Sequence, residues 1–270
     1  MLKDITLGQY YQTDSILHRM DPRVKLMGTL LFIVQLFCFR NFFGYIVTIV
    51  FLGIVIALSK VPFKFIIKGM RAIVFLLLIT VGFNLFLTPG TELFHIWKLR
   101  VTIEGLRLAG AMALRMMLLI IGSSILTLTT TPNHLTDAIE KSLGFLRVIK
   151  VPVHEIAMMM SIALRFIPIL MEETDKIMKA QIARGADFES GNLIKRAKAL
   201  VPLLVPLFIS AFRRANDLAM AMEARCYRGG DGRTKMKPLK YEKADYIAYI
   251  VLFLELVGAI IAGRVNILVV

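Results

Sequence analysis

The sequence lacks the short motifs that mark most enzymes. It contains no GxxxxGK[ST] phosphate-binding loop, no HExxH zinc motif and no GxSxG nucleophile turn. Its four histidines are scattered over loops and expected helix starts. An intramembrane metal hydrolase would need a clustered set of His and Glu residues, so that function is disfavoured. We expect no catalytic residue, no bound metal and no cofactor in this chain.

Cysteine and acidic residues are also scarce. The two cysteines are Cys38, inside an apolar run, and Cys226, in a basic region, so we expect no disulfide between them. No CxxC spacing is present. Asp and Glu number 19 against 33 Lys and Arg, which gives a formal net charge of +14. Such an excess is typical of proteins that meet nucleic acid or anionic lipid headgroups.

Hydrophobic residues, by contrast, are abundant. They make up 57% of the 270 residues, whereas a soluble domain is about 45–50% apolar. The first 25 residues are polar, and no small-residue cleavage site follows the first apolar run, so we expect no cleaved signal peptide. Five apolar runs reach or approach the length needed to cross a bilayer. They are Val24–Phe39, Phe42–Leu58, Ala72–Leu87, Leu106–Leu128 and Tyr246–Ala262.

The basic residues are distributed unevenly around these spans. They gather in the N-terminal tail, in the 60–71 loop and in residues 140–243, which hold 19 Lys and Arg against 11 Asp and Glu. Cytoplasmic loops are enriched in Lys and Arg. Five spans with the N-terminus inside place all three basic segments in the cytoplasm. The 91–104 loop, with Trp97 at headgroup level, then lies outside.

An amphipathic helix is expected at 133–148, because Thr131 can cap it and Pro132 suits its first position. Its apolar stripe would lie along the membrane surface, although an ordinary surface helix has the same pattern. The chain therefore divides into residues 1–130 with the first four spans, residues 131–243 as a cytoplasmic helical region, and residues 244–270 with the last span. The predicted class is an all-α polytopic membrane protein.

Two charged residues fall well inside the expected spans, away from their ends. Arg115 lies in the fourth span and Glu255 in the fifth. An arginine near the bilayer centre costs at least ~2.5 kcal/mol on insertion scales. These residues belong either to a substrate or proton path, or to bonds between helices and snorkelling near an interface. The second interpretation is favoured.

Two long helices are expected in the cytoplasmic region, His154–Ala183 and Asn192–Tyr227. Each carries an apolar stripe at helical spacing over many turns. Pro168, Pro202 and Pro206 should bend them. Seven of the 15 methionines lie in these helices. Methionine suits either an interface that repacks or simple core filling.

The two long helices end in similar short sequences. Ala183-Arg184-Gly185 closes the first, and Ala224-Arg225-Cys226 closes the second. A cation is favourable at any helix C-terminus, so each motif alone is weak and the duplication is what strengthens it. Small neighbours leave each arginine exposed, and an exposed arginine can form a bidentate pair with an acidic residue in a groove. Two such ends predict two similar grooves on a paired partner.

With these motifs, the chain resembles the T component of energy-coupling factor (ECF) transporters, the EcfT/CbiQ-like family, over essentially its whole length. The resemblance rests on Asp21-Pro22-Arg23-Val24-Lys25, on Thr130-Thr131-Pro132 followed by Leu135-Thr136-Asp137-Ala138-Ile139, and on the two Ala-Arg-x motifs. The one slight departure is Cys226, where a small residue such as Gly or Ser also occurs in the family.

The resemblance implies a non-catalytic scaffold of an importer for vitamins or other micronutrients in a bacterial cell membrane. The implied partners are two ATPase subunits, EcfA and EcfA', which bind the ATP and Mg, and a membrane-embedded substrate-binding S component. Nucleic acid is not among them. The residues implied in ATPase binding are Ala183, Arg184, Gly185, Ala224, Arg225 and Cys226. The S component would contact the apolar helix surface, where helical spacing selects Met159, Ala163, Phe166, Leu204 and Phe208.

Two other kinds of transporter are alternatives to this one. A conventional ABC permease subunit would need a coupling helix in each half, whereas both tips here lie in one segment. A stand-alone channel or secondary transporter usually shows repeated spans with broken helices, and no convincing repeat of spans occurs.

Overall fold

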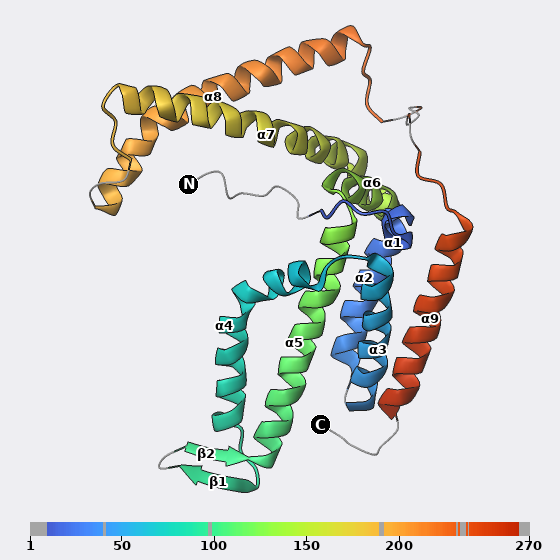
Figure 1. Cartoon of the computed structure of the whole chain (residues 1–270). Coiled ribbons are helices and arrows are strands. Elements are labelled where there is room, and N and C mark those ends of the chain that lie inside the picture. Colours follow the sequence, from blue (N-terminus) through green and yellow to red (C-terminus); the bar gives the residue numbers. More distant parts are fainter. Residues whose placement is uncertain are drawn as a thin grey trace. The chain divides into compact units, whose positions relative to one another are not determined.

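The computed structural model describes residues 10–39, 42–96, 99–188, 192–230, 232, 236 and 238–264. Contacts divide the chain into two compact units. The first, here called the bundle unit, comprises Gly8–Ser142 and Leu239–Val270. The second, here called the crossed-helix unit, comprises Met1–Leu7 and Leu143–Pro238. Helices dominate both units (Figure 1), so the all-α class is confirmed.

The bundle unit contains the predicted spans. Its helices are α1 (Ile16–Arg19), α2 (Pro22–Cys38), α3 (Phe42–Ser59), α4 (Phe63–Leu87), α5 (Ile103–Thr129), α6 (Pro132–Ser142) and α9 (Lys243–Arg264). The five apolar runs correspond to α2, α3, α4, α5 and α9, with ends that agree within three residues except at the start of α4, which begins nine residues earlier than predicted. α2 packs against α5, α6 and α9, α3 packs against α5 and α9, and α4 packs against α5.

A short antiparallel hairpin, which was not predicted from the sequence, joins α4 to α5. Strand β1 (Glu92–Ile96) pairs with β2 (Leu99–Thr102), with Glu92 opposite Thr102 and Ile96 opposite Leu99. The intervening Trp97, predicted at headgroup level, lies outside the described residues. Thr102 caps the start of α5 by accepting a hydrogen bond from the Gly105 amide.

By length and composition, five described helical segments could cross a membrane, and they are not the same five as the predicted spans. They lie in α3, α5 and α9 and in the two long helices, α7 (Val153–Ala183) and α8 (Leu193–Ala224). The mean hydropathy of the best segments is 2.5, 1.9 and 2.0 in the first three, but 1.6 in α7 and 1.3 in α8. α2 has only 17 residues, and within the part of α4 whose side chains the structure describes, the apolar segment is Ile73–Leu87. α7 and α8 are therefore the least apolar of the qualifying helices.

The two charged residues within the spans bond to neutral groups on other segments. The Arg115 guanidinium on α5 donates to the Tyr45 hydroxyl on α3 at 3.0 and 3.2 Å. Glu255 on α9 accepts a hydrogen bond of 2.6 Å from the Gln35 amide on α2, and both side chains are buried. These contacts join helices across the bundle, which agrees with the interhelical interpretation.

The crossed-helix unit begins with the 3₁₀ segment η2 (Leu143–Ile149) and continues into α7 and α8. The prediction of a single helix at 133–148 is wrong, because this segment changes from α-helix to 3₁₀-helix after Ser142. The segment is α6 followed by η2, and Gly144, a poor helix former, lies just after the break. The Thr131 cap is present, since its hydroxyl accepts from the His134 amide at 3.4 Å.

Candidate functional site

The long helices α7 and α8 pack against each other within the crossed-helix unit (Figure 1). An ion pair joins them, with an Arg214 Nη2 to Glu173 Oε2 distance of 2.8 Å. The hydrogen bond from Arg214 holds the pKa of the Glu173 carboxyl below its usual value. No local sequence pattern predicts this ion pair, because Glu173 and Arg214 lie 41 residues apart in the chain.

This ion pair lies at equal distances from the two helix ends. Arg184 is the eleventh residue after Glu173, and Arg225 is the eleventh residue after Arg214. At 1.5 Å per helical residue, each arginine lies about 16 Å along its helix from the contact. The two segments between the ion pair and the helix ends, residues 173–184 and 214–225, are therefore equal in length, and we call them the two arms.

α7 ends in a Schellman turn. Arg184 is the C-cap residue, and Gly185 follows with φ of +87°. The Gly185 amide donates to the Ile182 carbonyl at 2.9 Å, and the Ala186 amide donates to the Gln181 carbonyl at 3.0 Å. These two bonds define the motif and satisfy carbonyls that the helix end would otherwise leave unpaired.

α8 ends in the same turn. Arg225 is the C-cap residue, and Cys226 takes the left-handed position with φ of +56°. The Cys226 amide donates to the Glu223 carbonyl at 2.8 Å, and the Tyr227 amide donates to the Met222 carbonyl at 3.0 Å. The expectation that this helix reaches Tyr227 is wrong, because the left-handed residue ends the helix at Ala224.

The two Ala-Arg-x motifs thus have one backbone geometry. In both, an alanine is the last helical residue, the arginine is the C-cap, and the third residue is left-handed. Arg184 and Arg225 are both exposed. A left-handed L-residue costs roughly 1–2 kcal/mol, so Cys226 adopts this turn at a cost that Gly185 avoids. We name these two structures the arginine turns.

The predicted apolar contact surface on α7 and α8 is open. The exposed fractions are 58% for Met159, 54% for Leu204 and 64% for Phe208. Ala163 is exposed and Phe166 half-buried. Phe208 also packs against Phe212, with ring centroids 4.7 Å apart. Large contiguous apolar surfaces mark contacts with protein or membrane.

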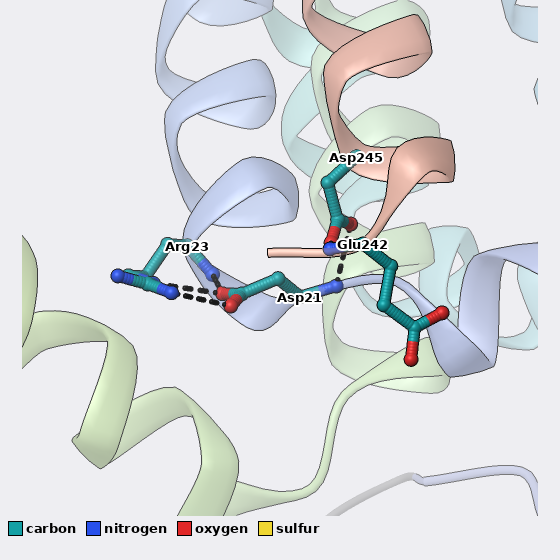
Figure 2. A network of polar contacts seen from close by, with 4 residues as sticks. All are labelled: Asp21, Arg23, Glu242 and Asp245. Atoms are coloured by element: carbon teal, nitrogen blue, oxygen red, sulfur yellow. Dashed lines mark hydrogen bonds and ion pairs between the residues drawn. The ribbon is translucent and has the colours of Figure 1, made fainter. Parts of the chain in front are cut away.

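A separate polar cluster in the bundle unit explains the Asp21-Pro22-Arg23 motif (Figure 2). The Asp21 carboxylate caps α2 by accepting from the Arg23 amide at 2.8 Å. The same carboxylate binds the Arg23 guanidinium through two hydrogen bonds of 3.0 and 2.7 Å. That guanidinium lies 3.9 Å from the centre of the Tyr241 ring, a cation–π contact.

Asp245 connects this cluster to α9. One carboxylate oxygen accepts from the Asp21 amide at 2.9 Å, and the other accepts from the Glu242 amide at 2.8 Å (Figure 2). The second bond is half of a capping box at the start of α9. Asp245 is buried, at 1% exposed. Asp245 was not predicted as a site residue, although an acidic residue in the first turn of a helix is a recognisable start signal.

The Lys25 ammonium extends the same cluster to α5. It donates to the Thr129 carbonyl at the end of that helix, at 3.0 Å. The cluster therefore fastens the starts of α2 and α9 and the end of α5 to one another. Among the described residues, no group of three or more His, Cys, Asp or Glu is placed to hold a metal ion.

Comparison with known proteins agrees with this architecture. Residues 13–236 match the CbiQ family, described as cobalt transport protein. The energy-coupling factor transporter transmembrane protein EcfT of Clostridium kluyveri is 62% identical over 92% of this chain and 93% of its own length. The chain belongs to the EcfT (CbiQ) family.

Further EcfT proteins align over nearly their whole length. The Thermosediminibacter oceani protein is 53% identical over 97% of this chain, and the Lactococcus lactis protein is 44% identical over 98%. This EcfT-family chain is a transmembrane component of an ECF transporter and a multi-pass membrane protein. The roles of the arginine turns and of the apolar surface remain predictions.

Proposed function

We propose that this EcfT-family chain is the scaffold that couples ATP hydrolysis by two partner ATPases, EcfA and EcfA', to reorientation of a substrate-binding S component. The single observation that carries the proposal is the pair of matched arginine turns on arms of equal length. One backbone geometry repeated on two helices suits two related subunits that offer similar grooves.

Each arginine turn is suited to insert its arginine into a groove on a partner protein. The arginine is the last residue before the chain reverses, so its guanidinium projects from a tip. Its alanine and Gly or Cys neighbours are small and leave space for the walls of a groove. A guanidinium binds a carboxylate through two parallel hydrogen bonds, which fixes direction as well as affinity. An acidic groove on each ATPase is therefore the expected receptor.

The ATPases require that α7 and α8 lie on the cytoplasmic side. The bias of Lys and Arg places residues 140–243 there, together with the N-terminus. Both long helices qualify as spans by composition, but α7 carries Glu172, Glu173, Asp175, Lys176 and Lys179 in its second half. Charges at that density are costly in hydrocarbon.

Coupling follows from the geometry. When ATP closes the two ATPases, their grooves carry the arginine turns, and α7 and α8 move relative to each other about their contact. An S component packed on the apolar surface around Met159 and Phe208 is then reoriented and releases a vitamin or other micronutrient inside. ATP biases the cycle only through contacts that differ between the two states. The chain itself supplies no catalytic group, and ATP and Mg bind to the ATPases.

The test is recovery of the ATPases with the tagged full-length chain. Arg184→Glu and Arg225→Glu each place a carboxylate in an acidic groove, so each should lower recovery at least tenfold, and together they should abolish it. Arg184→Lys keeps the charge but loses the planar fork, and should lie between Arg184→Glu and the parent protein. Arg165→Glu, an exposed site on α7 far from the tip, is the matched control. Undiminished recovery and uptake in the double variant would refute the docking role.

A further inference from the structure

An apolar cavity of about 250 Å³ lies at one end of the bundle unit. It is lined by the first parts of α2 and α9 and the last parts of α3 and α5, with side chains such as Phe32, Leu52, Ile125 and Val251. The cavity is open on one side, and the apolar side chains that line it lack dispersion contacts with other atoms of the chain. An apolar occupant would restore those contacts.

A second cavity, of about 320 Å³, adjoins the first and is lined in part by charged side chains. Ile16 and Leu58 line both cavities, whereas Arg19, Lys60 and Asp14 line only the second. Arg19 Nε donates to the Asp14 carboxylate at 2.7 Å. Arg19 and, more weakly, Lys60 hold the pKa of Asp14 below its usual value. Two cations and one carboxylate leave a net charge of +1 in this cavity.

We propose that the two cavities form one binding site for an anionic phospholipid. An acyl chain occupies the apolar cavity, and the phosphate lies beside Lys60 and Arg19. The order of the two cavities matches the order of groups along a phospholipid, and the net positive charge selects an anionic headgroup. The site lies where α3 ends and α2 begins, the level at which headgroups meet spanning helices.

The neighbouring lysine supports the division of roles between the cavities. Lys25 lines the apolar cavity, but its ammonium is engaged by the Thr129 carbonyl. Its alkyl stem therefore contributes apolar wall, and the headgroup is left to the second cavity. In the orientation proposed above, this end of the bundle faces the cytoplasmic leaflet, where anionic lipids produce a negative surface potential.

The experiment is native mass spectrometry of the purified full-length chain. The protein is incubated with phosphatidylglycerol or with phosphatidylcholine of identical acyl chains, and retained lipid is counted after detergent removal. We expect one retained phosphatidylglycerol per chain and weaker retention of phosphatidylcholine. One net charge near the surface predicts a preference of about fivefold. Equal retention of the two lipids would overturn the headgroup assignment.

Two pairs of variants separate the two cavities. Lys60→Gln should remove the preference for phosphatidylglycerol, whereas Lys64→Gln, an exposed lysine on α4 outside both cavities, should keep it. Val55→Phe should fill the apolar cavity and lower retention of both lipids at least tenfold. Val50→Phe, on the same helix but 57% exposed and outside the cavity, should not.

Three outcomes overturn the proposal. The first is unchanged lipid retention in both Lys60→Gln and Val55→Phe. The second is an equal loss in each variant and its control, which would show only a general membrane affinity. The third is retention of no lipid by the parent chain. None of these outcomes bears on ATPase recovery, so failure here leaves the docking proposal standing.

Discussion

The left-handed backbone of Cys226 makes a quantitative test of the arginine turns. At φ of +56°, an L-residue pays roughly 1–2 kcal/mol that glycine does not. Glycine in turn loses roughly 0.5–1 kcal/mol more conformational entropy on ordering. The difference predicts that Cys226→Gly stabilises the turn by about 0.5–1 kcal/mol. Because 1.4 kcal/mol is tenfold in an equilibrium constant, this stabilisation corresponds to a change of about two- to fivefold.

The assay is hydrogen–deuterium exchange of the peptide around Cys226 in the full-length chain. The amides of Cys226 and Tyr227, which donate to the Glu223 and Met222 carbonyls, should exchange about two- to fivefold more slowly in Cys226→Gly. Cys226→Ala removes the thiol but keeps the Cβ atom, so it should exchange like the parent. A better-ordered tip should also bind its ATPase more tightly by up to the same factor, because less conformational freedom is lost on binding.

The reverse change tests the same reasoning on the other helix. A Cβ atom at Gly185 would meet nothing within 4 Å, so Gly185→Ala introduces backbone strain without a clash. Exchange at Gly185 and Ala186 should speed up by about two- to fivefold. The reasoning is refuted if Cys226→Gly exchanges no more slowly than Cys226→Ala, or if Gly185→Ala has no effect.

Four further outcomes are expected. In a Cys38→Ser variant produced without the ATPases, an impermeant maleimide should label Cys226 in inverted vesicles but not in intact cells, and the reverse result would invert the topology; both cysteines are exposed in the chain alone. Phe208→Arg should reduce co-purification of the S component while Phe208→Leu preserves it, and equal recovery would move that partner elsewhere. Glu173→Gln should broaden the distance distribution between spin labels on the two arginine turns, whereas the exposed neighbour variant Glu172→Gln should not; identical distributions would show that the ion pair positions nothing. Asp245→Asn turns an amide donor toward a backbone N–H and should lower the unfolding free energy by about 1.5–3 kcal/mol, as seen in chemical denaturation; an unchanged midpoint would contradict the role drawn in Figure 2.

Local patterns located most of the helices. The apolar runs matched α2, α3, α4, α5 and α9 because the length of a span is set by bilayer thickness. Helical spacing likewise found α7 and α8. The boundaries that failed were decided by single residues. Cys226 ends α8 in a left-handed conformation that glycine usually supplies, and the break after Ser142 divides the expected amphipathic helix.

The candidate site was found in part. The repeated Ala-Arg-x motif identified both tips, since duplication is visible in sequence. The shared Schellman geometry could not be predicted, because no sequence pattern indicates that Cys226 adopts the left-handed backbone conformation that Gly185 adopts. The Asp21 motif was noticed as a family resemblance, but its purpose depended on Asp245, 224 residues away.

The sequence alone determined the class of this protein, the number and approximate place of its apolar helices, and the two arginine ends, because each of these depends on neighbouring residues and on their spacing. The tertiary structure alone decided which group each buried or partly buried charge binds. Glu173 selects Arg214, Asp245 joins the start of α2, and Glu255 meets Gln35. The same holds for the cavity beside α3. Such contacts depend on how helices that are distant in the sequence pack together. Each charged residue has many possible partners in the sequence, and only the packing of the fold selects one of them.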